Sequence, residues 1–201
     1  LTISDIDVEK LSALRRSNMS FENSSDSVGF VKSIIKNDEN DLKYRFVDFA
    51  PFVPSDESRR KERCKEIFEI QSSGLAKRLS HVGSKGCVIG VSGGLDSTLA
   101  LLVASKALKL IGKSNKDILG VTMPGFGTTD RTYNNAISLM KELGVTIKEI
   151  SIKDACVQHF KDIEHDIENK DITYENTQAR ERTQILFDLA NKNSMLLVGT
   201  G

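Results

Sequence analysis

CVIGVSGGLDSTLALLVASKAL, residues 87–108, joins a strand pattern to a helix pattern through two adjacent glycines. The apolar residues before the glycines are typical of a buried strand, and the apolar periodicity after them is typical of a helix. A purely structural turn needs one glycine at most, whereas Gly93 and Gly94 adjoin each other here. The polar side chains around them are those of Ser92, Asp96, Ser97 and Thr98. The segment therefore predicts a backbone loop that is open to an anion.

Apolar strand patterns alternate with helix patterns from Cys87 onward. Strands are expected at 87–91, 117–123, 145–151 and 194–199, and helices at 97–111, at 130–143 and within 153–191. Such alternation predicts an α/β fold with a doubly wound parallel sheet, in which right-handed crossovers place helices on both faces. Ligands of such sheets bind beyond the carboxyl ends of the strands, which is where the glycine loop lies.

The loop can bind phosphate without the residues of the common phosphate motifs. It opens onto the N-terminus of a helix expected to begin near Ser97, where free amides and the helix dipole favour a phosphate. It has no lysine at the Walker A position and is too short for G-x-G-x-x-G. Asp96 repels bare phosphate but suits a magnesium ion, which takes carboxylate and phosphate oxygens together. The alternative role of Asp96 is a helix N-cap or first-turn acid, and the sequence leaves both open.

Composition excludes several classes of protein. The formal net charge of the 201 residues is zero and no long basic stripe is present, so no nucleic-acid partner is expected. No apolar run approaches the ~20 residues of a membrane span, so no membrane partner is expected either. The three cysteines are scattered and odd in number, which argues against a disulfide framework and favours a reducing, cytoplasmic location. Cys156 and His159 form a lone CxxH without the further ligands that a zinc site needs.

The chain divides into three parts by composition. Residues 1–55 mix short apolar stretches with a serine- and asparagine-rich middle and are expected to be the edge of another domain. Residues 56–85 carry an approximate apolar stripe among charges and predict an amphipathic linker helix. Residues 86–201 form the α/β domain. Leu1 is not a natural start and Gly201 follows a strand pattern directly, so an excerpt of a longer polypeptide is expected.

The segment SGGLDS, residues 92–97, resembles the pyrophosphate-binding loop of the N-type ATP pyrophosphatases, a superfamily that includes GMP synthetase, asparagine synthetase and tRNA-modifying enzymes. Four longer segments, GVSGGLDSTLALLVA, TMPGFGTTDRTYNNAISLMKELG, YENTQARERTQILFDLAN and LLVGTG, together resemble NAD synthetase, in its glutamine-dependent form, over residues 56–201. Residues 1–55 are similar to the closing part of the nitrilase-like glutaminase domain of those enzymes. The glutaminase cysteine, lysine and glutamate would lie upstream of Leu1, and none of the cysteines here matches that nucleophile.

This resemblance implies an adenine nucleotide alpha hydrolase-like fold and a carbon–nitrogen ligase. The implied reaction is ATP-dependent amidation of deamido-NAD to NAD through an adenylate, with release of pyrophosphate and AMP. Its implied partners are ATP, magnesium, deamido-NAD, ammonia from glutamine, and further copies of the full-length enzyme in a homo-oligomer. Two alternatives stay open: another amidotransferase of the superfamily, such as GMP synthetase, or a nucleotide-binding module without turnover. Residues 1–201 alone are expected to be inactive.

The resemblance also assigns site residues, although it assigns none to catalysis. The implied ATP contacts are Gly90, Val91, Ser92, Gly93, Gly94, Leu95, Asp96, Ser97 and Thr200, with Asp96 as the metal ligand. The implied deamido-NAD contacts are Asn176 and Arg180, which share one polar helix stripe with Gln184; a solvated helix face is the alternative. Arg182 falls in the apolar arc of that helix and is interpreted as a paired structural cation, because an unpaired buried charge is costly.

The segment MPGFGTTDR, residues 123–131, has two interpretations. Its glycines could make a simple turn, with Thr129 or Asp130 capping the next helix. The resemblance implies instead that this loop borders the nucleotide.

Overall fold

The computed structural model describes residues 2–18, 44–45, 52–53 and 55–200. It divides into two compact units, Leu1–Glu57 and Ser58–Gly201. Much of the segment matched to a glutaminase domain lies outside the described residues, so that assignment stays a prediction. Within the described residues, no helix has the length and apolar character needed to cross a membrane.

The described part of the first unit contains one helix, α1 (Val8–Ser17). Asp7 caps this helix, since its Oδ1 accepts a hydrogen bond from the Lys10 amide at 2.8 Å. The second carboxylate oxygen of Asp7 lies 3.1 Å from Nη1 of Arg45. None of the residues of α1 is buried.

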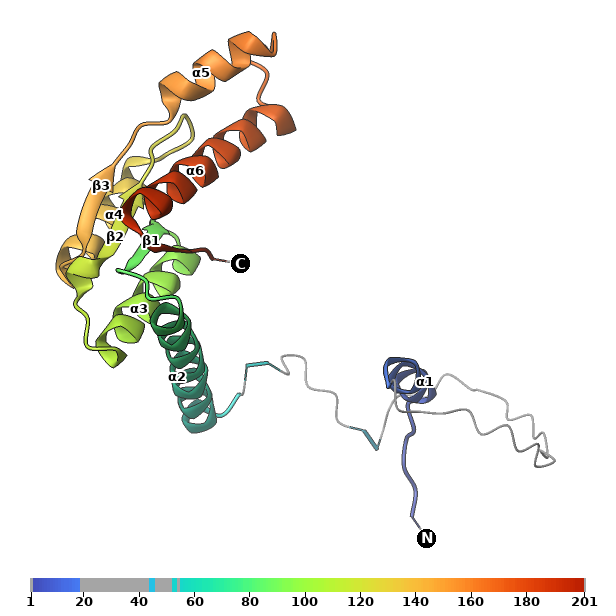
Figure 1. Ribbon diagram of the computed structural model, residues 1–201. Coiled ribbons are helices and arrows are strands. Elements are labelled where there is room, and N and C mark those ends of the chain that lie inside the picture. The colour runs from blue at the N-terminus through green and yellow to red at the C-terminus, as the bar shows by residue number, and fades with distance from the viewer. Residues whose placement is uncertain (1, 19–43, 46–51, 54, 201) are drawn as a thin grey trace. The chain divides into compact units, whose positions relative to one another are not determined.

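The second unit is built on a four-stranded parallel sheet (Figure 1). The strands are β1 (Cys87–Gly90), β2 (Ile118–Thr122), β3 (Thr146–Glu149) and β4 (Leu196–Val198), in the spatial order β3-β2-β1-β4. The parallel strands predicted from the sequence are confirmed. The chain moves outward from β1 to β3 and then returns to the other side of β1. The carboxyl end of β1 therefore lies where the strand order reverses, which is where such sheets bind ligands.

Helices cover both faces of this sheet, as a doubly wound fold requires. The larger helices are α2 (Glu57–His81), α3 (Leu95–Leu110), α4 (Asp130–Leu143), α5 (Lys153–Asp162) and α6 (Ile172–Asn193), and a short 3-10 turn, η1, covers Asn115–Asp117. One core cluster joins the sheet to α2, α3 and α4, and a second joins it to α5 and α6. Figure 1 shows α3 and α6 on opposite sides of the strands.

Alternation along β1 explains the two clusters. Cys87 and Ile89 belong to the α3 side, whereas Val88 belongs to the side of α5 and α6, and all three are fully buried. Burial raises the pKa of the Cys87 thiol to about 12, with a further contribution from the charge of Asp117. This thiol therefore stays protonated and serves as an apolar core group.

The expected linker helix is present as α2, but its apolar stripe is only partly correct. Leu79 is buried and Leu75 packs against the α3-side core. Cys64 and Ile67 are exposed. Among the described residues, the part of α2 that joins the core of the domain is its later part, at Leu75, Ala76 and Leu79.

Candidate functional site

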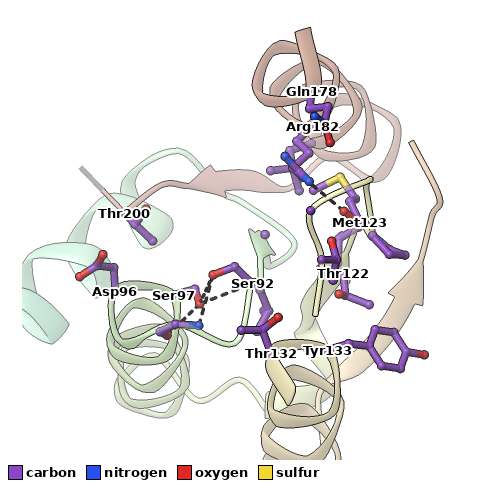
Figure 2. A pocket seen from close by; sticks show the side chains of 18 of the residues that line it. Ser92, Asp96, Ser97, Thr122, Met123, Thr132, Tyr133, Gln178, Arg182 and Thr200 are labelled. Atoms are coloured by element: carbon purple, nitrogen blue, oxygen red, sulfur yellow. Dashed lines mark hydrogen bonds between the residues drawn. The ribbon is translucent and has the colours of Figure 1, made fainter. Parts of the chain in front are cut away.

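A cleft of about 710 Å³ opens at the carboxyl ends of β1 and β2 (Figure 2). From β1, α3 and the loop between them come Gly90, Val91, Ser92, Gly94, Asp96 and Ser97. From β2, α4 and the loop between them come Val121, Thr122, Met123, Pro124, Gly127, Thr128, Thr132 and Tyr133. Helix α6 supplies Tyr174, Glu175, Gln178, Arg182 and Leu186, and Thr200 follows β4. Segments from the whole domain thus meet at one edge of the sheet.

The loop Ser92–Ser97 is closed by its own hydroxyl groups. The Ser92 amide donates to Oγ of Ser97 at 3.3 Å, and that hydroxyl lies 3.1 Å from the Oγ of Ser92. The Gly94 amide donates to Oγ of Ser92 at 3.3 Å, while Oγ of Ser97 donates to the Gly94 carbonyl at 3.1 Å. These short-range bonds hold the backbone in place before any ligand arrives.

The loop ends at the N-terminus of α3. Gly94 is the N-cap residue and provides no side-chain cap. The first-turn amides, those of Leu95, Asp96 and Ser97, therefore have no acceptor within the helix. With the dipole of a 16-residue helix behind them, these amides favour an anion at the cleft edge.

The two glycines of the loop differ in function. Gly93 has φ of +84°, and a Cβ there would lie 2.1 Å from the carbonyl oxygen of Thr132 in α4. Gly94 has φ of −87°, and a Cβ there would meet nothing closer than Oγ of Ser92 at 3.5 Å. Gly93 therefore lets the loop pack on α4, whereas Gly94 leaves room in the cleft.

Asp96 lies in the first turn of α3 and lines the cleft. Gly94 occupies the N-cap position, so the alternative role of Asp96 as the N-cap is wrong, whereas its alternative role as a first-turn acid is confirmed. Figure 2 shows Asp96 on the same side of the cleft as Thr200. Among the described residues, no group of three metal-ligating side chains is present. One exposed carboxylate beside a loop that is open to an anion nevertheless fits magnesium, which takes one or two carboxylates together with phosphate oxygens of a substrate.

The loop after β2 caps the next helix and also lines the cleft. Thr129 is the N-cap of α4, and its side chain accepts a hydrogen bond from the Thr132 amide at 3.4 Å. Pro124, Gly127 and Thr128 line the cleft. The turn interpretation, with Thr129 as the cap, is therefore confirmed, whereas contact of this loop with the nucleotide stays a prediction.

Contacts with α6 hold the β2 loop from the other side. The Phe126 amide donates to Oε1 of Gln178 at 3.1 Å. The Nε of Arg182 donates to the carbonyl of Met123 at 3.2 Å. Figure 2 shows the side chains of Gln178 and Arg182 extending from α6 toward this loop. Their position makes α6 the wall of the cleft opposite α4.

The part of α6 that faces the cleft is not the stripe expected from the sequence. Tyr174, Gln178 and Arg182 are four residues apart and line the cleft, whereas Asn176 and Arg180 are outside the described lining. The spacing of the first three was visible in the sequence as another polar or aromatic stripe of the same helix. The assignment of Asn176 and Arg180 to deamido-NAD stays a prediction that rests on the resemblance.

The remaining assignments divide as follows. Of the residues assigned to ATP, those that line the cleft are Gly90, Val91, Ser92, Gly94, Asp96, Ser97 and Thr200, and their contact with ATP stays a prediction. Gly93 faces α4, and Leu95 is exposed outside the lining. Arg182 was expected to pair with an acid, but among the described residues no carboxylate lies within ion-pair distance of it. The expectation fails because α6 turns this residue toward the open cleft and the Met123 carbonyl.

The N-terminus of α6 is fixed by a cap and an aromatic stack. Oδ1 of Asp171 accepts hydrogen bonds from the amides of Thr173 at 2.8 Å and Tyr174 at 3.1 Å. The bond from Tyr174 is the largest of the effects that hold the pKa of Asp171 below its usual 3.8. The ring of Tyr174 stacks on Phe160 with centroids 5.5 Å apart. These contacts place Tyr174 at the edge of the cleft.

On the α4 side, the hydroxyl of Tyr133 donates to Oε2 of Glu149 at 2.7 Å. This bond raises the pKa of Tyr133, so the phenol stays a neutral donor. It links α4 to the end of β3 next to the cleft.

A parallel sheet, a glycine and serine loop at its switch point and a free helix N-terminus define an α/β domain of the adenine nucleotide alpha hydrolase-like class. The sequence model of the NAD synthase family matches residues 67–201. The chain belongs to the NAD synthase family.

Sequence identity and the share of each chain that aligns describe how similar this chain is to known proteins. The chain is 47% identical over 161 residues to the glutamine-dependent NAD(+) synthetase of Mycobacterium leprae, an alignment that covers 78% of this chain and 24% of that protein. The chain thus spans about a quarter of the length of these glutamine-dependent relatives.

Two solved structures have the same fold. The glutamine-dependent NAD+ synthetase of Acinetobacter baumannii, in complex with ADP, matches with a TM-score of 0.62 and 28% identity over 68% of this chain and 25% of that one. The NH3-dependent NAD synthetase of Campylobacter jejuni, in complex with the nitrate ion, matches with a TM-score of 0.60 and 25% identity. That match covers 68% of this chain and 56% of the Campylobacter chain.

Proposed function

We propose that the protein carrying this chain amidates deamido-NAD to NAD at the expense of ATP. A carboxylate oxygen of deamido-NAD bonds to the α-phosphorus of ATP while the bridging bond to the β-phosphate breaks, so that pyrophosphate leaves. Ammonia then attacks the adenylate, displaces AMP and leaves the amide. Membership of the NAD synthase family supports this choice of substrate.

The observation that carries the proposal is the open loop Ser92–Ser97 at the head of α3. Its backbone is already held by the Ser92 and Ser97 hydroxyls, and Asp96 and Ser97, whose amides have no acceptor within α3, line the cleft. A preorganised set of donors stabilises charge where it accumulates without reorganising during the reaction. In this reaction the accumulating charge is that of the departing pyrophosphate, so the loop is assigned to the β- and γ-phosphates.

The remaining parts of the site follow from their positions. Thr200 is assigned to the ATP side of the cleft, as are Gly90 and Val91. Asp96 would hold magnesium together with the phosphates, and magnesium when bound neutralises phosphate charge. Asn176 and Arg180 are assigned to deamido-NAD on the resemblance alone.

The whole protein needs more than the described cleft. Relatives named as glutamine-dependent support glutamine as the ammonia source, and those named as NH3-dependent support direct use of ammonia. We assign residues 1–55 to the end of a glutaminase domain, 56–85 to the linker and 86–201 to the synthetase domain. A cytoplasmic homo-oligomer completes the proposal.

The test supplies the protein that carries this chain with ATP, magnesium and ammonia, and compares two acceptors. Deamido-NAD should give stoichiometric pyrophosphate and NAD, and xanthosine monophosphate should give neither. Pyrophosphate release with xanthosine monophosphate alone would instead identify a GMP synthetase. ATP binding without release of pyrophosphate with either acceptor would identify a nucleotide-binding module and overturn the proposal.

A further inference from the structure

Arg182 is the one basic side chain among the described residues that line the cleft. The acidic side chains of that lining are Asp96 and Glu175. Under the proposed function, this cleft receives two polyanions, ATP and a dinucleotide, and brings a carboxylate up to a phosphate. Mutual repulsion of these groups opposes the reaction, so a cation in the cleft matters for the chemistry.

The guanidinium of Arg182 has a fixed position. Its Nε donates to the Met123 carbonyl at 3.2 Å, at the carboxyl end of β2. A Cβ on Gly125 would lie 2.7 Å from Nη2 of Arg182 and 2.6 Å from Oε1 of Gln178, so only a glycine leaves this space for the two side chains. The backbone of the β2 loop thus approaches the guanidinium closely and holds it at the cleft wall.

The bond to Met123 does not neutralise the charge of Arg182, because a carbonyl carries no net charge. A carbonyl is satisfied by a neutral donor, and the neighbouring Gln178 holds the same loop with a neutral amide group. Among the described residues, no carboxylate lies within ion-pair distance of Arg182. Partial burial lowers the pKa of the Arg182 guanidinium below its usual range, because the charged group is incompletely solvated. A half-buried cation of this kind is stabilised by an anion.

We infer that the terminal nitrogens of Arg182 bind a non-bridging oxygen of the α-phosphate of ATP during adenylation. The inference rests on the proposed function. The Ser92–Ser97 loop takes the β- and γ-phosphates at the end of β1, and Arg182 stands across the cleft at the end of β2 (Figure 2). As the carboxylate bonds to the α-phosphorus and pyrophosphate departs, charge on these oxygens is offset by the planar guanidinium, whose fork suits phosphate.

The experiment measures single-turnover release of pyrophosphate from ATP and deamido-NAD, without ammonia, in the protein that carries this chain. Arg182→Gln should slow release about 100-fold, as expected for loss of one preorganised donor. Arg182→Lys keeps the positive charge but lacks the planar guanidinium group. Its rate of pyrophosphate release should fall between the rates of Arg182→Gln and the wild type. Lys192→Gln removes an exposed charge from the same helix, outside the cleft, and should change nothing.

Two further variants distinguish phosphate binding from a purely structural tether. Gln178→Ala removes the neighbouring tether without changing charge and should slow release less than tenfold. Millimolar guanidinium chloride should restore part of the rate of Arg182→Ala, since it supplies the missing cation. Equal losses in Arg182→Gln and Gln178→Ala, without rescue by guanidinium, would overturn the inference. If Arg182→Gln does not fold, the lysine variant and the rescue experiment decide.

Failure of the proposed function is distinguishable from failure of this inference. If the wild type releases no pyrophosphate with deamido-NAD, equilibrium titration with ATP and with adenosine takes the place of kinetics. Arg182→Gln should then weaken the affinity for ATP at least tenfold and leave the affinity for adenosine unchanged. An unchanged affinity for ATP would refute the role of Arg182 whatever the acceptor is.

Discussion

The loops that follow β1 and β2 leave neighbouring strands of the sheet and line the same cleft, yet they are held in different ways. The β1 loop is closed by hydrogen bonds within Ser92–Ser97. The β2 loop is held by Gln178 and Arg182, which lie 52 and 59 residues further along the chain than their partners Phe126 and Met123. The described side-chain bonds of the first loop are therefore all local, whereas the second combines one local bond, from the Gly125 amide to Oγ1 of Thr128 at 3.0 Å, with the two bonds to α6.

Under the proposed function, the two loops have different roles in one site. Under the proposed function, a loop closed by its own hydrogen bonds suits the phosphates of ATP, and it depends on the rest of the domain mainly where Gly93 packs on Thr132 of α4. The shape of a loop that is bound to a distant helix depends on the position of that helix. Under the proposed function, such a loop suits the side of the cleft that receives deamido-NAD. We expect changes in the β1 loop to affect ATP binding, and changes at the contact with α6 to affect the acceptor as well.

The largest effect should come from substitution of Gly93, because the Ser92–Ser97 loop packs on α4 at this residue. Gly93→Ala places a side chain at φ of +84° and a Cβ 2.1 Å from the Thr132 carbonyl. The free energy of unfolding should fall by roughly 2–5 kcal/mol, from the left-handed backbone and the overlap together. Gly94→Ala is the matched control and should cost less than about 1 kcal/mol. Urea unfolding of both variants measures these losses. Equal losses in the free energy of unfolding would show that the two glycines have the same structural role.

Asp96→Asn should leave the fold intact and stop most of the chemistry. The side chain is exposed in the first turn of α3, so its charge contributes only about 0.3–1 kcal/mol to stability through the helix dipole. Magnesium-dependent release of pyrophosphate should fall about 100-fold or more, in line with the loss of one electrostatic group at a reaction centre. Unchanged turnover at saturating magnesium would refute the metal role of this carboxylate.

Gln178→Ala tests the long-range half of the comparison. It leaves the Phe126 amide without its acceptor and should lower the free energy of unfolding by about 1–3 kcal/mol. Gln184→Ala, at an exposed position of the same helix, is the control and should stay within about 0.5 kcal/mol of the wild type. The apparent affinity for deamido-NAD should weaken more than that for ATP in Gln178→Ala. Equal weakening of the two would mean that the β2 loop is not specific to the acceptor side.

The smallest effect concerns the cap of α6, which positions the same wall. The pKa of Asp171 is held below its usual 3.8 in the folded protein, chiefly by the Tyr174 amide. A carboxyl of this kind adds stability above its unfolded pKa, and that stability is lost as the pH falls through the folded value. The slope of stability against pH below about 4 should therefore be shallower in Asp171→Asn than in the wild type. Identical slopes would show that the cap does not depend on the charge.

The local part of this molecule could be predicted from the sequence. The strand after Lys85, the loop Ser92–Ser97 and the cap at Thr129 all follow from residues within a few positions of one another. The parallel direction of the strands was predicted from the alternation of strand and helix patterns. The helix α3 begins at Leu95, two residues before the expected start near Ser97, because Gly94 rather than a later side chain takes the N-cap position.

The long-range part could not be predicted in this way. Whether α6 turns Tyr174, Gln178 and Arg182 or the stripe of Asn176 and Arg180 toward the cleft depends on how Ile185 and Leu189 pack under the sheet. Periodicity identifies the stripes of a helix but not which of the polar ones faces a ligand. The same limit made Arg182 look like an ion-paired residue, since no local pattern shows that its neighbour is the Met123 carbonyl.

The central claim is that the loop Ser92–Ser97 binds the phosphates of ATP through amides that Gly94 leaves uncovered. Isothermal titration of magnesium-ATP into the wild-type protein and into Gly94→Val tests it most directly. Valine is compatible with φ of −87° at this position and should cost only about 1 kcal/mol as a poor N-cap residue, while its side chain fills the space in front of the amides. The account predicts a folded variant whose affinity for ATP is at least tenfold weaker. A folded Gly94→Val protein that binds ATP as tightly as the wild type would contradict it.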